Sequence, residues 1–252
     1  GAAGRLGIGG GGARGFDVAG EGLRTSGLSG VELDEQGAMT MVARAGTLVA
    51  EIEALLAENG QRLAFEPMDH RGLLGTEGVP TIGGVFAANV SGPRRIQVGA
   101  ARDFLLGVRF VDGAGQVVKN GGRVMKNVTG YDLVKLMSGA HGTLVVLSEV
   151  SFKVLPLPEA EATVRVTDVD LEVAVQVMAA ALGSPFDVTG AAYDPALRQA
   201  YVRVEGFAGA VEYRASRLVS DLARFGETQQ VDERAELWRG IRDVAAFQGR
   251  EG

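Results

Sequence analysis

The sequence contains no cysteine, only two histidines and no long hydrophobic run. Without cysteine the chain cannot form disulfide bonds, thiolate metal sites or an iron–sulfur cluster on its own ligands. The two histidines, His70 and His141, do not form a histidine-rich cluster in the sequence. No apolar run approaches the roughly 20 residues that cross a bilayer. We therefore expect a soluble protein that binds no metal.

Positive charge is also in short supply. The chain carries 25 lysines and arginines against 31 acidic residues, which gives a formal net charge of −6. Nucleic acids and anionic membranes select for clustered positive charge, so a general affinity for either is not expected. A phosphate group bound by such a protein would be held chiefly by backbone amides.

The chain is nevertheless long enough for one large domain or two modest ones, with 252 residues of which 46% are hydrophobic. Glycine becomes sparser after "LPLPEAEA", which predicts one domain over residues 1–157 and a second over 158–252. The sequence begins at Gly1 without a signal peptide and stops just after a helical pattern. We expect an internal piece of a longer, cytoplasmic protein.

A glycine-rich loop stands near the start, "GIGGGGARG" at residues 7–15. Gly7, Gly9 and Gly12 match the spacing G-x-G-x-x-G, the fingerprint of a Rossmann dinucleotide-binding turn. That turn needs a helix directly after the glycines, and "ARGFDVAGEGLRTSG" cannot form one, even though Glu32 lies where a ribose-binding acid would stand. A flexible linker is a second interpretation. We favour a third, in which successive backbone N–H groups curl around a phosphate.

The remaining pattern mixes strands and helices. It predicts a strand over 38–46, a helix over 47–60 capped by Thr47, and a hairpin over 104–121. Asp170 is expected to cap a helix over 170–183. The other predicted elements are a strand at "RLAFEP", a short helix in "GYDLVKLMSGAHG", a strand over 143–156, and helices over 208–225 and in "AELWRGIRDVAAF".

Two further motifs follow the glycine loop in order, "TIGGVFAANVSGPRR" at 81–95 and "GGRVMKNVTGYDLVKLMSGAHGTLVVLSEVSFKVLP" at 121–156. Together the three resemble the FAD-binding domain of the vanillyl-alcohol oxidase and p-cresol methylhydroxylase (PCMH) family, over about residues 5–157. Within it, "SGPRR", "VMKNVTGYD" and "SEVSFKVLP" are most similar to the FAD-binding E subunits of bacterial glycolate oxidases.

The resemblance implies an α+β protein, in which a two-subdomain PCMH-type FAD-binding domain is followed by a partial α+β cap domain. The glycine loop would wrap the pyrophosphate of FAD, "TIGG" would follow the phosphate and ribityl chain, and "NVSG" would lie near the flavin. The implied cofactor-binding residues are Gly9, Gly10, Gly11, Gly12, Ala13, Arg14, Gly15, Thr81, Gly83, Gly84, Asn89, Ser91, Gly92, Asn127, Gly130, Tyr131 and Val146.

Some family members tether FAD through a His or Cys near the glycine loop, where this chain has Ala13 and Arg14, so we expect noncovalent FAD. Relatives commonly read "GSEGTLG" where this chain has "GAHGTLV". No catalytic residue can be assigned. The adjacent Arg94 and Arg95 could meet a flavin oxygen, a substrate carboxylate or another subunit, although arginines are more often solvated.

Three functions remain open at this point. The resemblance implies a subunit of a multi-subunit glycolate oxidase that takes part in oxidising a 2-hydroxy acid, with a second flavin subunit and an iron–sulfur subunit as partners. Membrane association would then come through those partners. A non-catalytic assembly subunit that keeps the fold is the second possibility, and a free-standing flavin dehydrogenase for another 2-hydroxy acid is the third. The missing histidine cluster favours the first two.

Overall fold

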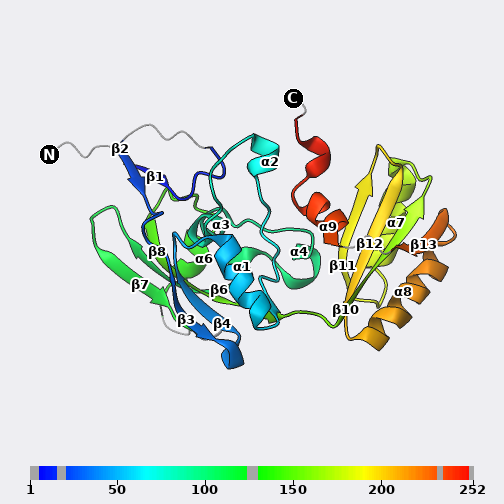
Figure 1. Cartoon of the computed structure of the whole chain (residues 1–252), viewed down its shortest axis with the longest axis horizontal. Coiled ribbons are helices and arrows are strands. Elements are labelled where there is room, and N and C mark those ends of the chain that lie inside the picture. Colours follow the sequence, from blue (N-terminus) through cyan, green and yellow to red (C-terminus); the bar gives the residue numbers. More distant parts are fainter. Residues whose placement is uncertain (1–5, 16–20, 124–129, 232–234, 250–252) are drawn as a thin grey trace. The chain divides into compact units, whose positions relative to one another are not determined.

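The computed structural model describes residues 6–15, 21–123, 130–231 and 235–249 (Figure 1). The chain divides into two compact units. The first unit comprises residues 1–92, 99–157 and 247–252, and the second comprises 93–98 and 158–246. Within the described ranges, no helix is both long and apolar enough to span a membrane.

The first unit begins with a small parallel sheet. Strands β1 (Leu6–Gly9) and β2 (Glu21–Arg24) pair with Leu6 opposite Glu21 and Gly9 opposite Arg24. The glycine loop leaves the end of β1 and forms bends and a turn instead of a helix over residues 10–15. A Rossmann turn is therefore not formed by the described part of this loop, because that turn requires a helix directly after the glycines.

A five-stranded antiparallel sheet forms the body of the first unit. Its order is β3-β4-β8-β6-β7. The strands are β3 (Val31–Glu35), β4 (Thr40–Arg44), β8 (Val146–Lys153), β6 (Leu105–Val111) and β7 (Val117–Gly121). The hairpin predicted over 104–121 is confirmed, with Val111 opposite Val117 and the Asp112 carboxylate accepting the N–H of Ala114 at 2.9 Å.

Short helices cover this sheet. The helical segments of the first unit are α1 (Val49–Glu58), α2 (Arg71–Leu74), α3 (Ile82–Ala88), α5 (Ala101–Phe104), α6 (Leu133–Met137) and the 3-10 turn η1 (Gln36–Ala38). Strands β5 (Gln61–Arg62) and β9 (Leu155–Pro156) form a separate two-stranded antiparallel sheet. Four buried phenylalanines with ring centroids 5.4–5.6 Å apart fix α3 against β8: Phe65, Phe86, Phe104 and Phe152.

The predicted cap of the first helix is wrong by one residue. Helix α1 begins after Leu48, which makes no side-chain capping bond. The hydroxyl of Thr47 instead accepts the N–H of Gly30 at 2.9 Å and donates to the carbonyl of Arg44 at 2.7 Å. Thr47 thus joins two loops of the first unit, and its hydroxyl is not available to the helix.

The second unit has the order β10 (Ala160–Thr167), α7 (Leu171–Leu182), β11 (Val188–Asp194), β12 (Gln199–Gly206), α8 (Ala208–Leu222) and β13 (Glu227–Val231). Its antiparallel sheet has the order β11-β12-β10-β13, so this is a ferredoxin-like βαββαβ arrangement. Asp170 caps α7 as predicted, with its carboxylate accepting the N–H of Val173 at 2.9 Å. Short helices α4 (Arg95–Val98) and α9 (Ala235–Arg242) belong to the same unit, and the 3-10 turn η2 (Ala245–Phe247) follows α9.

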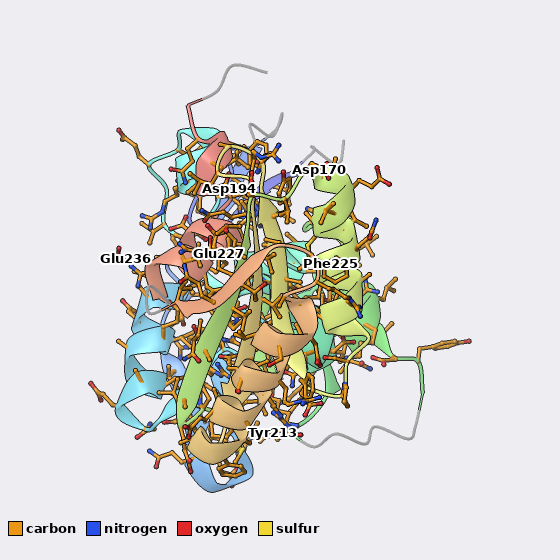
Figure 2. All side chains as sticks on the ribbon, turned by 90° about the vertical axis from the view of Figure 1, so that its right-hand side faces the viewer. Asp170, Asp194, Tyr213, Phe225, Glu227 and Glu236 are labelled. Atoms are coloured by element: carbon orange, nitrogen blue, oxygen red, sulfur yellow. The ribbon has the colours of Figure 1, made fainter. Side chains whose placement is uncertain are left out.

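The two faces of the second sheet differ in chemistry. Figure 2 labels Asp170 at the start of α7 and Tyr213 on α8, the two helices that pack on one face over a buried apolar core that includes Val164, Val202 and Leu218. Neighbouring positions on β10 and β12 point to the opposite face because side chains alternate along a strand. That face carries buried polar residues, among them Thr163, which lies opposite Arg203.

Candidate functional site

A pocket in the first unit brings together segments that are far apart in the sequence. The glycine loop forms one wall, the segment leading into α3 forms another, and the turn and strand around residues 141–147 form a third. The pocket is lined by Ile8, Gly9–Gly15, Thr25, Ala45, Met68, His70, Val79, Pro80, Thr81, Gly83, Gly84, Val85, Ala87, Val90, His141, Gly142, Val145 and Leu147. Ten of the predicted site residues, Gly9–Gly15, Thr81, Gly83 and Gly84, therefore share one pocket.

The glycine loop is held by its carbonyl groups. The carbonyl of Gly11 accepts the N–H of Val79 at 2.7 Å, and the carbonyl of Ala13 accepts the hydroxyl of Thr76 at 2.6 Å. The N–H groups over residues 10–14 have no acceptor within the described part of the chain. A run of unpaired backbone N–H groups in a bent loop is a nest, the geometry that binds anions such as phosphate.

Backbone geometry explains why positions 11 and 12 of this loop are glycine. A Cβ on Gly11 would overlap the carbonyl of Val79. On the facing segment, a Cβ on Gly78 would overlap the carbonyl carbon of Gly12. Gly12 also has φ +76°, a left-handed conformation that other residues rarely adopt. The loop therefore packs backbone against backbone on residues 78–79, and only glycine permits that approach.

Arg14 is the one side chain of the loop that carries charge. Its Nη2 donates to the carbonyl of Gly84 at 2.8 Å, so the guanidinium lies along the pocket wall. Burial lowers the pKa of Arg14, because desolvation disfavours the charged form. The other ionisable residues in the described lining of the pocket are His70 and His141, and that described lining includes no Asp or Glu. In a protein with an excess of acids, the described residues thus give this pocket ionisable groups of basic type.

The segment entering α3 supplies structure to the pocket. The Thr81 hydroxyl caps α3 by accepting the N–H of Gly84 at 3.3 Å. Gly83 donates its N–H to the carbonyl of Ala45 at 2.8 Å, and a Cβ on Gly83 would meet Ala45 at 2.6 Å. The sequence suggests that Gly83 is small to admit a ligand or another backbone, and the neighbour found in the structure is the backbone of Ala45.

The predicted residues Asn89, Ser91 and Gly92 lie outside the pocket lining. Asn89 ends α3 with φ +52°, and its side-chain oxygen accepts the N–H of Arg102 at 2.8 Å. The Ser91 hydroxyl accepts the N–H of Ala101 at 2.9 Å. Both side chains thus hold the start of α5, while Gly92 donates its N–H to the carbonyl of a buried core residue, Phe65.

The remaining predicted residues divide into two groups. Asn127 lies outside the described residues. Gly130, Tyr131 and Val146 are described but do not line the pocket, and Tyr131 is 88% exposed. Val146 is flanked in the sequence by the two lining residues Val145 and Leu147.

Several lining residues were not predicted from the sequence, including Thr25, Met68, His70 and His141. His70 stands in a loop between predicted elements, and no local pattern connects it with the glycine loop, which lies far earlier in the sequence. His141 offers a signal in retrospect, because it is a non-glycine residue with φ +53° between two glycines of positive φ. Such backbone outliers are enriched at functional sites, but they become visible only in the structure.

The adjacent arginines separate in the structure. Arg94 is buried and donates to both carboxylate oxygens of Glu205, with N–O distances of 2.7 Å. Arg95 is exposed to solvent, as arginines usually are, whereas Arg94 is not. Arg203, which is also buried, stacks over the ring of Trp238 at 4.4 Å and lies 3.9 Å from Glu205.

Comparison with known proteins agrees with this geometry. Residues 6–121 match the family described as FAD binding domain. The chain is 42% identical to the glycolate oxidase subunit GlcE of Escherichia coli over 175 residues, which cover 69% of this chain and 47% of that protein. It is 30% identical to the glycolate oxidase subunit GlcD of Bacillus subtilis over 58% of this chain and 29% of that protein. The chain thus spans half or less of the length of these relatives.

The fold has solved counterparts as well. A structure of alkyldihydroxyacetonephosphate synthase superposes with a TM-score of 0.75 over 96% of this chain and 50% of that one, at 17% identity. At that identity the likeness concerns the fold. The matched segment contains both the glycine loop and the segment entering α3, so the pocket lies largely within the matched domain. Residues 6–121 therefore form an FAD binding domain of the PCMH type, with FAD as its cofactor.

Proposed function

We propose that the pocket holds the pyrophosphate of FAD noncovalently, through the N–H groups over residues 10–14 and the guanidinium of Arg14. The observation that carries this proposal is a partly buried arginine in a pocket whose described lining residues include no carboxylate. Among the described residues the hydrogen-bond partner of Arg14 is the neutral carbonyl of Gly84. A partly buried cation without a counterion favours an anionic ligand, and a pyrophosphate supplies two negative charges.

The other predicted residues enter the proposal according to their position. Thr81, Gly83 and Gly84 would shape the wall along the phosphates and ribityl chain, and Gly9 and Gly15 would bound the loop. Asn89, Ser91 and Gly92 would act indirectly, by fixing α5 beside α3. Asn127, Gly130, Tyr131 and the backbone of Val146 remain proposed contacts to parts of FAD beyond this pocket. The proposed FAD-binding domain spans residues 1–157, and residues 158–252 form part of a cap.

For the whole protein, we propose the FAD-binding subunit of a multi-subunit glycolate oxidase. Support comes from the relatives named as glycolate oxidase subunits and from others named D-lactate dehydrogenase. When bound, FAD supplies a two-electron acceptor for the oxidation of a 2-hydroxy acid to a 2-oxo acid. Because the chain has no cysteine, we propose that an iron–sulfur cluster would be carried by a partner subunit, and that any membrane association would pass through partners.

A non-catalytic assembly role is the second candidate. It is favoured by the sequence, in which the two histidines, His70 and His141, form no histidine-rich cluster. In that case the fold and the flavin would serve subunit assembly, and substrate would be oxidised elsewhere.

A visible absorption spectrum of the purified protein separates these proposals. Oxidised-flavin bands that move to the supernatant after acid precipitation would support noncovalent FAD. Bleaching of those bands by added glycolate would support a catalytic subunit, whereas stable bands would favour the assembly role. A colourless protein that takes up no added FAD would contradict the proposed site.

A further inference from the structure

We propose that Thr76 is a positioning residue of the proposed FAD site, whose hydroxyl holds the peptide between Ala13 and Arg14 with the N–H of Arg14 directed toward the phosphates. This inference rests on the proposed function, because it takes the pyrophosphate of FAD as the ligand. It goes beyond that function by assigning a role to a side chain outside the described lining of the pocket. It also names the backbone donor through which that side chain acts.

The bond from Thr76 fixes one peptide group of the glycine loop. Its hydroxyl donates to the carbonyl of Ala13 at 2.6 Å, across 63 positions of sequence. A trans peptide is planar, so the carbonyl of Ala13 and the N–H of Arg14 point in opposite directions. The carbonyl is directed at Thr76, and the N–H is therefore directed away from it. Because Ala13 and Arg14 line the pocket and Thr76 does not, we infer that this N–H faces the side on which an anion would bind.

Two other carbonyls of the loop are held by backbone donors. The carbonyl of Gly9 accepts the N–H of Thr25 at 2.9 Å, and the carbonyl of Gly11 accepts the N–H of Val79 at 2.7 Å. The Thr25 hydroxyl also approaches the Gly9 carbonyl, at 3.4 Å, but that carbonyl already has the shorter bond from the N–H. Thr76 differs from these anchors because its donor is a side-chain hydroxyl. A substitution at position 76 can therefore release one peptide while leaving the other two anchors in place.

The fold also fixes the orientation of the Thr76 side chain. Gly75 ends α2 with φ +62°, and the N–H of Thr76 donates to the carbonyl of Arg71 at 3.2 Å. The methyl group of Thr76 lies next to Gly15, where an added Cβ would approach it to 2.8 Å. In a β-branched side chain, χ1 places the methyl group and the hydroxyl together. Thr76 thus contacts the loop at two points, with its methyl group at Gly15 and its hydroxyl at Ala13.

Loss of this anchor would change what the loop offers to an anion. The released peptide lies between Gly12 and Gly15, and glycine-rich backbone readily adopts other conformations. A peptide that turns over presents its carbonyl oxygen to the phosphates, which repel it, in place of an N–H. A nest binds an anion only while its N–H groups converge on it. The hydroxyl of Thr76 therefore acts on affinity through the peptide, without touching the ligand.

The test is a titration of the apoprotein with FAD, followed by quenching of flavin fluorescence. Thr76→Val keeps the branched shape and removes the hydroxyl, so we expect Kd to rise about fivefold, the factor that corresponds to one hydrogen bond of ordinary strength. Thr76→Ser keeps the hydroxyl and should stay close to the wild-type Kd. Phosphorus NMR provides a readout that a merely structural role would not move. The resonances of the bound pyrophosphate should shift in Thr76→Val and remain in place in Thr76→Ser.

Thr40→Val provides a matched control. The Thr40 hydroxyl also donates to a backbone carbonyl of the first unit, that of Ala38 at 3.2 Å, and neither residue belongs to the described lining of the pocket. This variant should keep the wild-type Kd and phosphorus resonances, and circular dichroism should show that each variant is folded. Should Thr76→Val fail to fold, Thr76→Ala also removes the hydroxyl and has the same expected result.

Three results would overturn this inference while leaving the proposed function intact, because the wild-type protein would still bind FAD. They are an unchanged Kd in Thr76→Val, an equal rise of Kd in Thr76→Ser or Thr40→Val, and phosphorus resonances of bound FAD that are identical in the wild type and Thr76→Val. Failure of the wild-type apoprotein to bind FAD would instead overturn the proposed function.

Discussion

Arg94 and Glu205 form a buried bidentate ion pair across 111 positions of sequence. Arg94 lies two residues after the end of the "NVSG" motif, yet residues 93–98 belong to the second unit, and the chain returns to the first unit at Gly99. The pair therefore anchors residues 93–98, which lie between two segments of the first unit in the sequence, to the second unit. A second cation, Arg203, lies 3.9 Å from the same carboxylate.

Removing either partner should destabilise the second unit to different extents. Arg94→Ala leaves Glu205 beside Arg203, so we expect a loss near the lower end of the roughly 3–5 kcal/mol that breaking a buried pair costs. Glu205→Ala leaves two buried arginines and should cost more. Urea unfolding followed by the fluorescence of Trp238, the only tryptophan of the chain, reports on this unit. The double variant Arg94→Met/Glu205→Met should lose less than the sum of the single changes, and equal losses for the two alanine variants would contradict this account.

Gly11→Ala should abolish retention of FAD. The added Cβ overlaps the carbonyl of Val79, so the loop must leave the position that its carbonyl bonds define. Flavin content per protein, measured by absorbance, checks the loss, and the Trp238 unfolding transition should stay unchanged. Gly113→Ala is the matched control, because a Cβ there meets nothing within 4 Å. Normal flavin content in Gly11→Ala would remove the loop from the proposed site.

Arg14→Gln should weaken FAD binding by about 1.5–3 kcal/mol, the contribution typical of a hydrogen bond to a charged group. It should also reduce the dependence of Kd on salt, because one partly exposed cation, whose attraction for the anion salt screens, is lost from the pocket. Arg14→Lys keeps the charge without the planar guanidinium, so its Kd for FAD should lie between that of the wild type and that of Arg14→Gln. Fluorescence titrations at two salt concentrations measure both effects. A salt dependence identical to that of the wild type would mean that Arg14 does not face the bound anion.

Gly190→Ala should disturb the second unit through Trp238. A Cβ at Gly190 would lie 2.7 Å from the indole ring, which also donates its N–H to the Thr163 hydroxyl at 2.9 Å and covers Arg203. We expect a red-shifted tryptophan emission as the ring moves toward water, with an unfolding free energy lowered by about 1–3 kcal/mol. Gly209→Ala, where nothing lies within 4 Å, should leave the emission unchanged.

Local patterns in the sequence predicted the local structure well. The alternation and turn residues around Asp112 predicted the β6–β7 hairpin, and Asp170 marked the start of α7. The cap of α1 was misplaced because the Thr47 hydroxyl bonds to Gly30, 17 positions earlier, and no local rule contains that partner. Hydrogen bonds between segments that are distant in the sequence could not be predicted from local patterns.

The same limit applies to the site. The spacing of the glycines and the three ordered motifs predicted the loop and the start of α3, which share the pocket. The reasons for individual glycines were not accessible, because Gly11 is constrained by Val79 and Gly83 by Ala45, both of which come from other segments. His70 carried no spacing signal, and His141 stood in the third motif only as a departure from its usual pattern, so it is the fold that brings both residues to the pocket.

The anchored carbonyls of the glycine loop have a consequence for the entropic cost of binding the cofactor. A loop that first becomes ordered around its ligand sacrifices conformational entropy at each binding event, which lowers affinity. Here the bonds from Val79 and Thr76 already fix the backbone before any ligand arrives. The loop is thus a preorganised receptor, and the bond from Arg14 to the Gly84 carbonyl occupies only one of the five N–H donors of the guanidinium.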